Sequence, residues 1–181
     1  DERAAIGAAQ QGDVQAFNQL VLEYQSMAYN VAYRILGDDD MAADACQEAF
    51  LSAYRNIRRL RGESFKAWLL RIVTNACYDQ LRHKKRRPAD SLDELLDESN
   101  HNPMVADPSP LPEQQALRHE LEAAIIAGIQ TLPYDQRITL VLADVQGLSY
   151  EEIAQVTGVS LGTVKSRLSR GRGKLRDYLL D

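Results

Sequence analysis

The sequence predicts an all-α protein built from two small helical domains. Apolar residues recur at helical spacing along most of the 181 residues, and no strand-length stretch alternates apolar with polar side chains. Residues 88–112 break this pattern, because they hold five of the six prolines among Asp, Glu, Ser and Asn. We therefore expect a first domain over residues 1–87, a flexible acidic linker over 88–112 and a second domain over 113–181.

Glycines and aspartates predict where the helices of the first domain begin and end. Glycine adopts the left-handed conformation that ends a helix at little cost, and an aspartate oxygen can accept hydrogen bonds from the free amides of a helix start. These signals predict a short first helix, a long amphipathic second, a third that starts in a run of aspartates, and a fourth after a cationic loop. The boundary residues are Gly12, Asp13, Gly37, Asp38–Asp40 and Gly62, and the fourth helix follows from the apolar residues between Phe65 and Leu81.

The second domain is predicted to contain two helices followed by a helix-turn-helix. Leucines and isoleucines four residues apart give the first of these helices an apolar stripe, a Leu-Pro pair breaks it, and a glycine closes the next helix. The stripe consists of Leu117, Leu121, Ile125 and Ile129, the break is at Leu132-Pro133, and the closing residue is Gly147.

The helix-turn-helix signals lie in residues 148–176, LSYEEIAQVTGVSLGTVKSRLSRGRGKLR. Ser149 followed three residues later by Glu152 is a capping box, in which each side chain bonds the amide of the other residue. Gly158 ends the first helix and Ser160 caps the second. Two helices joined by a tight turn are therefore expected.

The second helix of this unit has the composition of a DNA-recognition helix. Its apolar stripe lies on one side, and small polar groups and cations point the other way. Small groups let base edges approach, an arginine can read a guanine, and other cations can hold phosphates. The alternative is an ordinary helical hairpin with a solvated basic face, which does not explain why caps, turn glycine and segregated charge occur together. The candidate DNA-binding residues are Thr163, Lys165, Ser166, Arg167 and Arg170.

A second cationic block indicates another contact with a polyanion. The net charge is −5, yet residues 55–87 hold eleven basic and two acidic residues. One face of the fourth helix combines Arg, Asn and Tyr, which can stack on and hydrogen-bond unpaired bases. Trp68 could also stack on a base, but its place in the apolar stripe favours core packing. The face consists of Arg71, Asn75, Tyr78 and Arg82.

Asp44, Gln47 and Glu48 share one face of the third helix. No histidine or third carboxylate is arranged to join them, so neither acid–base catalysis nor a metal site is supported. Two interpretations stay open from the residues alone: a solvated acidic surface, or a surface that binds a partner.

The remaining residues indicate no enzyme, cofactor or metal site. Cys46 and Cys77 are isolated, and the three histidines lack the spacing of metal ligands. No apolar stretch is long enough for a signal peptide or a membrane span. We therefore expect a protein of the reducing cytoplasm that does not insert into membranes and needs no cofactor.

The order of the motifs indicates a family. The chain strongly resembles the extracytoplasmic-function (ECF) sigma factors of bacterial RNA polymerase in three segments: DACQEAFLSAYRNI, FKAWLLRIVTNACYDQLR and LPYDQRITLVLADVQGLSYEEIAQVTGVSLGTVKSRLSRGRGKL. The resemblance covers about Ala16 to Leu180 and keeps these segments in order on either side of the acidic linker.

This resemblance implies a division of labour between the domains. Residues 1–87 look like sigma region 2, which binds the clamp coiled coil of core polymerase and opens the −10 promoter element. Residues 113–181 look like sigma region 4, which reads the −35 element as duplex, with the polymerase flap as its partner on the enzyme. The residues that match the polymerase-binding pattern are Asp44, Gln47, Glu48 and Phe50. Those that match the loop around a flipped base are Leu60, Arg61 and Gly62, with Asn75 beside them; the recognition-helix residues given above match the −35 reader.

The resemblance also implies a stress response controlled by an anti-sigma factor, which can hold the chain at the inner membrane. Two departures leave the promoter sequence open: the stretch between Gly62 and Trp68 is one residue shorter than in relatives, and Ser169 stands where some relatives carry a bulkier side chain. A helix-turn-helix activator or repressor with a sensory first domain is one rival, but it does not explain the second basic block. A nuclease or ligase is the other; such an enzyme needs clustered carboxylates or a nucleophilic lysine, and the only carboxylate cluster lacks metal-ligand geometry.

Overall fold

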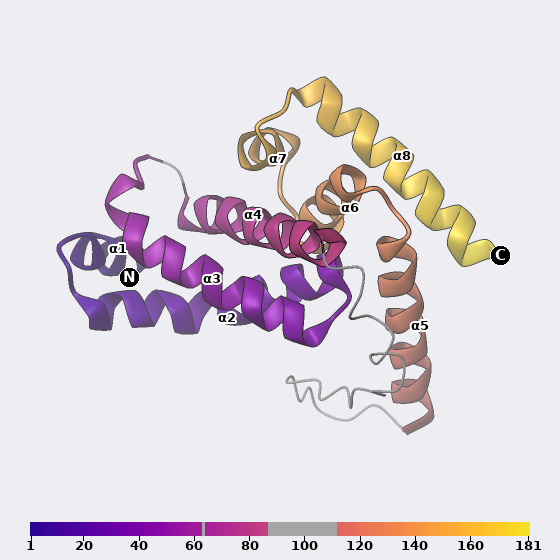
Figure 1. The fold of residues 1–181 in the computed structure, drawn as a ribbon, viewed down its shortest axis with the longest axis horizontal. Helices are drawn as coiled ribbons and strands as arrows, with labels where there is room; N and C mark the ends of the chain where they lie inside the picture. The colour runs from indigo at the N-terminus through magenta and orange to yellow at the C-terminus, as the bar shows by residue number, and fades with distance from the viewer. Residues whose placement is uncertain (63, 87–111) are drawn as a thin grey trace.

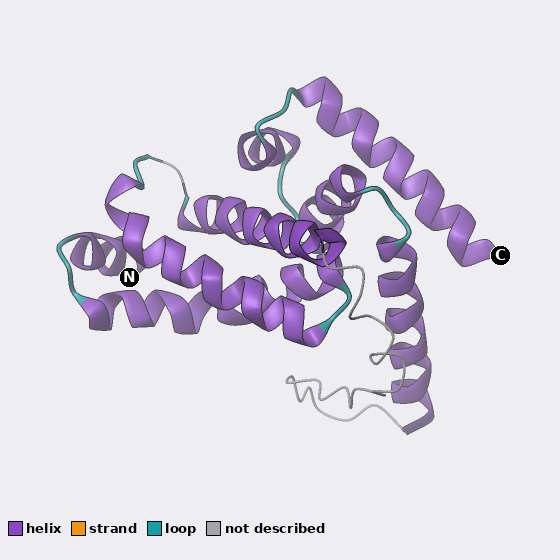
Figure 2. Cartoon of the chain, viewed as in Figure 1, coloured by secondary structure: helices purple, strands orange, loops and turns teal. Residues whose placement is uncertain are grey.

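The computed structural model describes residues 1–62, 64–86 and 112–181, and throughout those residues it consists of helices and loops with no strand (Figure 2). The predicted all-α fold is confirmed. The predicted linker lies, apart from Pro112, outside the described residues. The domain boundaries expected at the two ends of this linker stay a prediction.

The N-terminal half is a bundle in which the two longest helices, α2 and α4, both pack against α3, and α1 packs against α2 (Figure 1). A short 3-10 turn, η1, connects α3 to the loop before α4. The elements are α1 (Glu2–Gln10), α2 (Val14–Leu36), α3 (Asp39–Asn56), η1 (Ile57–Arg59) and α4 (Phe65–Arg86).

The predicted helix boundaries of this half are confirmed where the caps can be seen. The Asp13 carboxylate accepts hydrogen bonds from the first free amides of α2, and that of Asp38 accepts one from Met41 N at 2.8 Å at the start of α3. Gly37 ends α2 with φ 69°, a left-handed conformation that side chains other than glycine adopt only with strain.

Alanines bring the helices of the N-terminal half close together. Ala42, Ala45, Ala49 and Ala53 form one fully buried row along α3, and larger residues of α2 and α4 fill the space against it. Trp68 is only 6% exposed, so the core interpretation of this side chain is confirmed.

The C-terminal half contains the predicted helices and one irregularity. The helix after the Leu-Pro break changes at Val141 into a π-helical turn, which leads to the loop before the helix-turn-helix. The elements are α5 (Pro112–Gln130), α6 (Tyr134–Leu140), the π-helix η3 (Val141–Val145), α7 (Tyr150–Thr157) and α8 (Leu161–Leu180).

The predicted apolar stripe of α5 is buried only at its C-terminal end. Ile129 is 1% exposed, whereas Leu117 and Leu121 are 68% and 57% exposed. Helical periodicity locates a helix, but it does not determine how far along that helix a neighbour extends.

The two halves pack against each other. α2 contacts α5, α6 and η3, and α4 contacts α7, so that α4 lies between α3 and the C-terminal helices (Figure 1). The buried apolar residues of both halves form one continuous cluster. Sequence patterns did not predict this packing, because each half already shows the periodicity of a self-contained bundle.

Among the described residues, every helix is too short or too polar to cross a bilayer.

Candidate nucleic-acid interface

Local hydrogen bonds fix the helix-turn-helix as the sequence predicts. The Ser149 hydroxyl accepts from Glu152 N at 3.2 Å, and Ser149 N donates to the Glu152 carboxylate at 2.8 Å, which completes the capping box of α7. Gly158 ends α7 with φ 70°, and the Ser160 hydroxyl accepts from Thr163 N at the start of α8. The turn is thus determined by side chains within a few residues of it.

The buried side of α8 sets which of its residues face outward. Val164, Leu168 and Gly171 are buried, and α8 packs along α6. A Cβ on residue 171 would lie 3.4 Å from the carbonyl oxygen of Gln136, so α8 runs within van der Waals contact of α6 at this position. The direction opposite this stripe is open to solvent over the first half of α8.

The five predicted recognition residues are not equally available on this surface. Lys165 and Arg170 are exposed. Thr163 and Ser166 are half-buried, and the Ser166 hydroxyl donates to Thr163 O at 3.0 Å. Arg167 is turned toward α6, where its guanidinium donates to the Asp135 carboxylate at 3.2 Å. Lys165 and Arg170 are therefore the readily accessible cations of the set.

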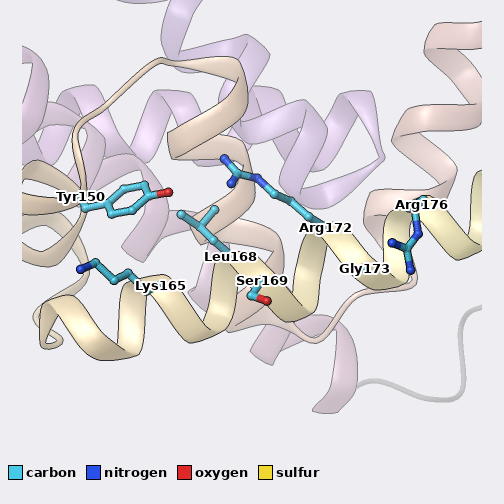
Figure 3. A pocket seen from close by; sticks show the side chains of 7 residues that line it. All are labelled: Tyr150, Lys165, Leu168, Ser169, Arg172, Gly173 and Arg176. Atoms are coloured by element: carbon cyan, nitrogen blue, oxygen red, sulfur yellow. The ribbon is translucent and has the colours of Figure 1, made fainter.

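Beside the recognition surface, α7 and α8 enclose an open hollow of about 540 Å³ (Figure 3). Lys165, Ser169, Arg172 and Arg176 line it from α8, and Tyr150 closes it from α7. Sequence reasoning did not single out Tyr150. The cationic lining suits an anionic strand running past the start of α7.

Arg172 is held by an ion pair. Its guanidinium donates to Asp144 at two points, 3.0 Å from Nε and 2.6 Å from NH2. The hydrogen bond to this carboxylate raises the pKa of Arg172 above its ordinary value, and a hydrogen bond to Tyr150 adds to the effect. Arg172 therefore stays charged, with much of its charge compensated within the protein.

The outward face of α4 brings together the residues predicted to bind unpaired bases. Asn75 and Arg82 are exposed, Tyr78 is 45% exposed, and Arg71 is half-buried. The Arg82 guanidinium lies over the Tyr78 ring, 5.6 Å from its centroid. An aromatic ring, an amide and cations on one helix face can stack on and hydrogen-bond bases outside a duplex.

The loop before α4 is anchored by its first residue. Leu60 is 6% exposed, and its carbonyl oxygen accepts a hydrogen bond from Gln10 Nε2 at 3.0 Å. Its side chain is therefore directed into the protein. Arg61 and Gly62 are exposed, and Gly62 has φ 71°, a turn that favours glycine.

The acidic face of α3 is one wall of a groove of about 480 Å³, and α4 forms the other. Phe50 does not line it, because it is half-buried and packs against the core. Leu51 does line it and is 45% exposed; as the residue three positions after Glu48, it could have been found from helical spacing. The groove residues are Asp44, Gln47, Glu48 and Leu51 from α3 and Ala76, Asp79, Gln80 and His83 from α4.

No group of three or more His, Cys, Asp or Glu side chains that could hold a metal occurs in the part of the chain that the structure describes. Cys46 is partly buried, and this burial raises the pKa of its thiol to about 11. Cys77 is fully buried, which raises its pKa further. Both thiols therefore stay protonated and unreactive near neutral pH.

Comparison with known proteins identifies both halves. Models of Sigma-70 region 2 and of Sigma-70, region 4 match residues 20–87 and 122–175. The ECF RNA polymerase sigma factor SigE of Mycolicibacterium smegmatis is 38% identical over 169 residues, which are 93% of this chain and 63% of SigE. The ECF RNA polymerase sigma-E factor of Haemophilus influenzae is 37% identical over 182 residues, which cover 98% of this chain and 95% of that protein.

A solved structure has the same arrangement of helices. The sigma factor RpoE from Bartonella quintana, determined in complex with the anti-sigma factor NepR, superposes with a TM-score of 0.70 at 29% identity, covering 92% of this chain and 98% of RpoE. Region 2 and region 4 matches in order, together with relatives that match 93% and 98% of this chain, confirm the resemblance seen in the sequence. The chain belongs to the ECF sigma factors of RNA polymerase.

Proposed function

We propose that this chain binds core RNA polymerase and directs it to specific promoters, reading the −35 element with α8 and opening the −10 element with α4. The observation that carries this proposal is the presence of two separate helix faces with nucleic-acid chemistry on one chain. The face of α8 suits duplex DNA, whereas that of α4 suits unpaired bases. A protein that locates a promoter as duplex and then opens it needs a surface for duplex DNA and a surface for unpaired bases.

At the −35 element, α8 enters the major groove with its small residues toward the bases. Arg170 is exposed beside Ser166 and Thr163, and it is the side chain we assign to a base edge. Lys165 lies at the edge of the hollow beside Tyr150, where it can contact a phosphate. Arg167 supports the surface through its bond to Asp135 and can reach DNA by exchanging that carboxylate for a phosphate.

At the −10 element, a base leaves the stack and is held between α4 and the loop before it. Asn75 supplies hydrogen bonds, Tyr78 supplies a ring for stacking, and Arg71 and Arg82 supply positive charge along the strand. In the loop, Arg61 and Gly62 are accessible, while buried Leu60 holds the loop in place.

Core polymerase occupies the groove between α3 and α4, which suits a cationic helix with an apolar edge. Asp44 and Glu48 line the groove from α3 and Asp79 lines it from α4, and Leu51 offers an apolar contact on the α3 side. The clamp coiled coil is the element we assign to this groove, with Phe50 supporting α3 from within. We assign the polymerase flap to the C-terminal half.

An anti-sigma factor is the second proposed protein partner. The solved RpoE structure contains the anti-sigma factor NepR, and this chain has the same helix arrangement. We place the chain in the cytoplasm, with attachment to the inner membrane only through such a partner. Sigma factors are transcription regulators, and the proposed role requires no catalytic group, cofactor or metal of this chain.

Footprinting tests this proposal. Promoter DNA from the source genome is probed with the free chain, with core polymerase and with both together, and permanganate detects unpaired thymines. The expected result is protection of two separate elements only when chain and core are combined, with unpaired thymines at the downstream element alone. Strong specific protection by the free chain, unaffected by core and without melting, would instead indicate a repressor or activator.

A further inference from the structure

Tyr134 at the start of α6 joins the C-terminal half to the base-binding face of α4. Its hydroxyl donates to the carbonyl oxygen of Thr74 at 2.6 Å, and its ring lies 5.1 Å from that of Tyr78, centroid to centroid. Burial is the main reason that the pKa of Tyr134 is raised, so the phenol keeps the proton that it donates. The Tyr78 ring is thus already contacted by Tyr134, with Arg82 of its own helix also near it.

Two further side chains of the C-terminal half bind the end of α2. Gln130 Nε2 donates to Arg34 O at 2.6 Å, and Arg137 NH1 donates to Ile35 O at 2.7 Å. These carbonyls belong to the last turn of the helix, where they have no partner within the helix itself. Gly37 lets Gln130 come this close, because a Cβ there would lie 2.8 Å from the Gln130 side chain.

Two further polar contacts join the halves. Lys66 at the start of α4 donates to Gln146 O at 3.2 Å, and Arg34 forms an ion pair with Glu122 of α5 at 3.3 Å. The halves are therefore joined at the start and in the middle of α4 and at the end of α2. This contact is a specific, hydrogen-bonded interface.

We propose that Gln130, Tyr134 and Arg137 form a clasp that holds the free chain closed and keeps a displaced DNA strand from the α4 face until the halves separate. A base that stacks on Tyr78 needs the space that Tyr134 occupies, so the closed chain and the strand-bound chain exclude each other. The apparent affinity for a single strand is then reduced by the fraction of chains that are open. The α8 surface, with Lys165 and Arg170 exposed, is accessible in both states.

The conformational part of this inference is independent of the sigma-factor role, and the strand-binding part rests on the proposed function. Arg137 is a poor choice for substitution because it also bonds the carbonyls of Gln130 and Leu132 at the end of α5. The double variant Gln130→Ala/Tyr134→Phe removes two bonds across the interface, together with the bond that Gln130 Oε1 accepts from Arg137 within its own half. Thr131→Ala is its matched control, since that hydroxyl bonds only Gly128 O within its own half.

Fluorescence energy transfer measures the closure directly. Donor and acceptor are attached to cysteines introduced at the exposed positions Gln25 on α2 and Glu151 on α7, with Cys46 and Cys77 replaced by alanine. We expect one high-transfer population for the parent and for Thr131→Ala, and an approximately tenfold lower closed-to-open ratio for the double variant, which corresponds to about 1.4 kcal/mol. Small-angle scattering of chains with native cysteines provides a label-free check. A parent that is already open, or a double variant as closed as the parent, would overturn the clasp, whether or not the chain directs initiation.

Fluorescein-labelled single-stranded and duplex oligonucleotides of random sequence test the occlusion. The double variant should bind the single strand up to about tenfold more tightly, in proportion to its open fraction, and bind the duplex almost unchanged. Adding Arg82→Ala to the double variant should weaken its single-strand binding, because that guanidinium lies on the strand-binding face of α4. Opening without tighter single-strand binding, or single-strand binding by the double variant that Arg82→Ala leaves unchanged, would show that the closed state does not occlude α4.

Discussion

Arg172 and Asp144 join the second half of the recognition helix to the π-helix η3 through a two-point ion pair, with the shorter contact at 2.6 Å. Both side chains remain substantially exposed, so the pair is screened by solvent and contributes about 0.2–1 kcal/mol to stability. Its stronger effect is on charge. A cation that the basic sequence alone would assign to DNA phosphate is already opposed by a carboxylate.

Lys174 and Arg172 should therefore differ in their effect on DNA binding. Lys174 is exposed and has no ion pair among the described residues. Lys174→Ala should weaken binding to DNA of every sequence by the same factor. If Lys174 contacts one phosphate, the substitution should also reduce the slope of log affinity against log salt by about 0.9. Arg172→Ala should change the slope less, because its guanidinium is already paired with Asp144 and neutralises less phosphate charge. Titrations over a salt series check this, and equal slopes for the two variants would mean that DNA displaces Asp144.

Arg170→Ala should relax sequence preference instead of lowering affinity in general. Losing one bidentate contact to a base costs about 1–3 kcal/mol at that position and little elsewhere. Binding of the polymerase complex to a library of −35 variants measures this, with Lys174→Ala as the comparison. A uniform loss over the whole library would show that another part of α8 faces the bases.

Glu48→Lys should weaken binding to core polymerase without unfolding the chain. Glu48 is exposed in the groove with Asp44 and Asp79, so a lysine there repels a cationic partner, at a cost of several kcal/mol at a close contact. Glu23→Lys on α2 makes the same charge change at an exposed site away from the groove. The test is the affinity of each folded variant for core polymerase. Equal affinities for the Glu48→Lys and Glu23→Lys chains would show that the acidic face of α3 is only a solvated surface.

Ser149→Ala should destabilise the helix-turn-helix by about 1 kcal/mol, because it removes one of the two reciprocal bonds of the capping box. Gln155→Ala, at an exposed position inside the same helix, should cost little. Denaturant titrations give both values. A Ser149→Ala chain as stable as its Gln155→Ala counterpart would mean that tertiary packing alone determines where α7 starts.

Stability should fall at alkaline pH. Burial raises the pKa of Cys46 from 9.0 to about 11, so the folded chain holds this proton more tightly than the unfolded chain does. The contribution is fully present below pH 9 and is lost as the pH rises through about 11. Cys77 and Tyr134, raised further, act in the same direction. Denaturant midpoints between pH 8 and 11 test this: the decline should be smaller for Cys46→Ala, and an identical decline would exclude Cys46 as a cause.

Features set by neighbouring residues could be predicted from the sequence. The caps at Asp13, Asp38, Ser149 and Ser160 depend on a side chain and an amide two or three residues away, so the local sequence contains both partners. The same applies to the buried stripe of α8, which follows from helical spacing.

The contacts between the halves could not be predicted in this way. Arg137 bonds the carbonyl oxygen of Ile35, 102 positions earlier, and Tyr134 bonds that of Thr74, 60 positions earlier. Every residue has a backbone carbonyl oxygen, so the sequence does not indicate which residue accepts the hydrogen bond. The pairing of Arg172 with Asp144 was missed for a related reason, since the sequence shows both charges but not which of many partners each one meets.

The shared apolar cluster makes separation of the halves dependent on temperature. Apolar surface that becomes hydrated raises the heat capacity, so the opening equilibrium has a curved temperature dependence, as unfolding does. The joined form is most favoured at one temperature and loses population on both warming and cooling from it. A chain closed by polar contacts alone would show curvature of the opposite sign, because hydrating polar surface lowers the heat capacity. The way the two halves are buried together therefore also determines the temperature at which the α4 face becomes accessible.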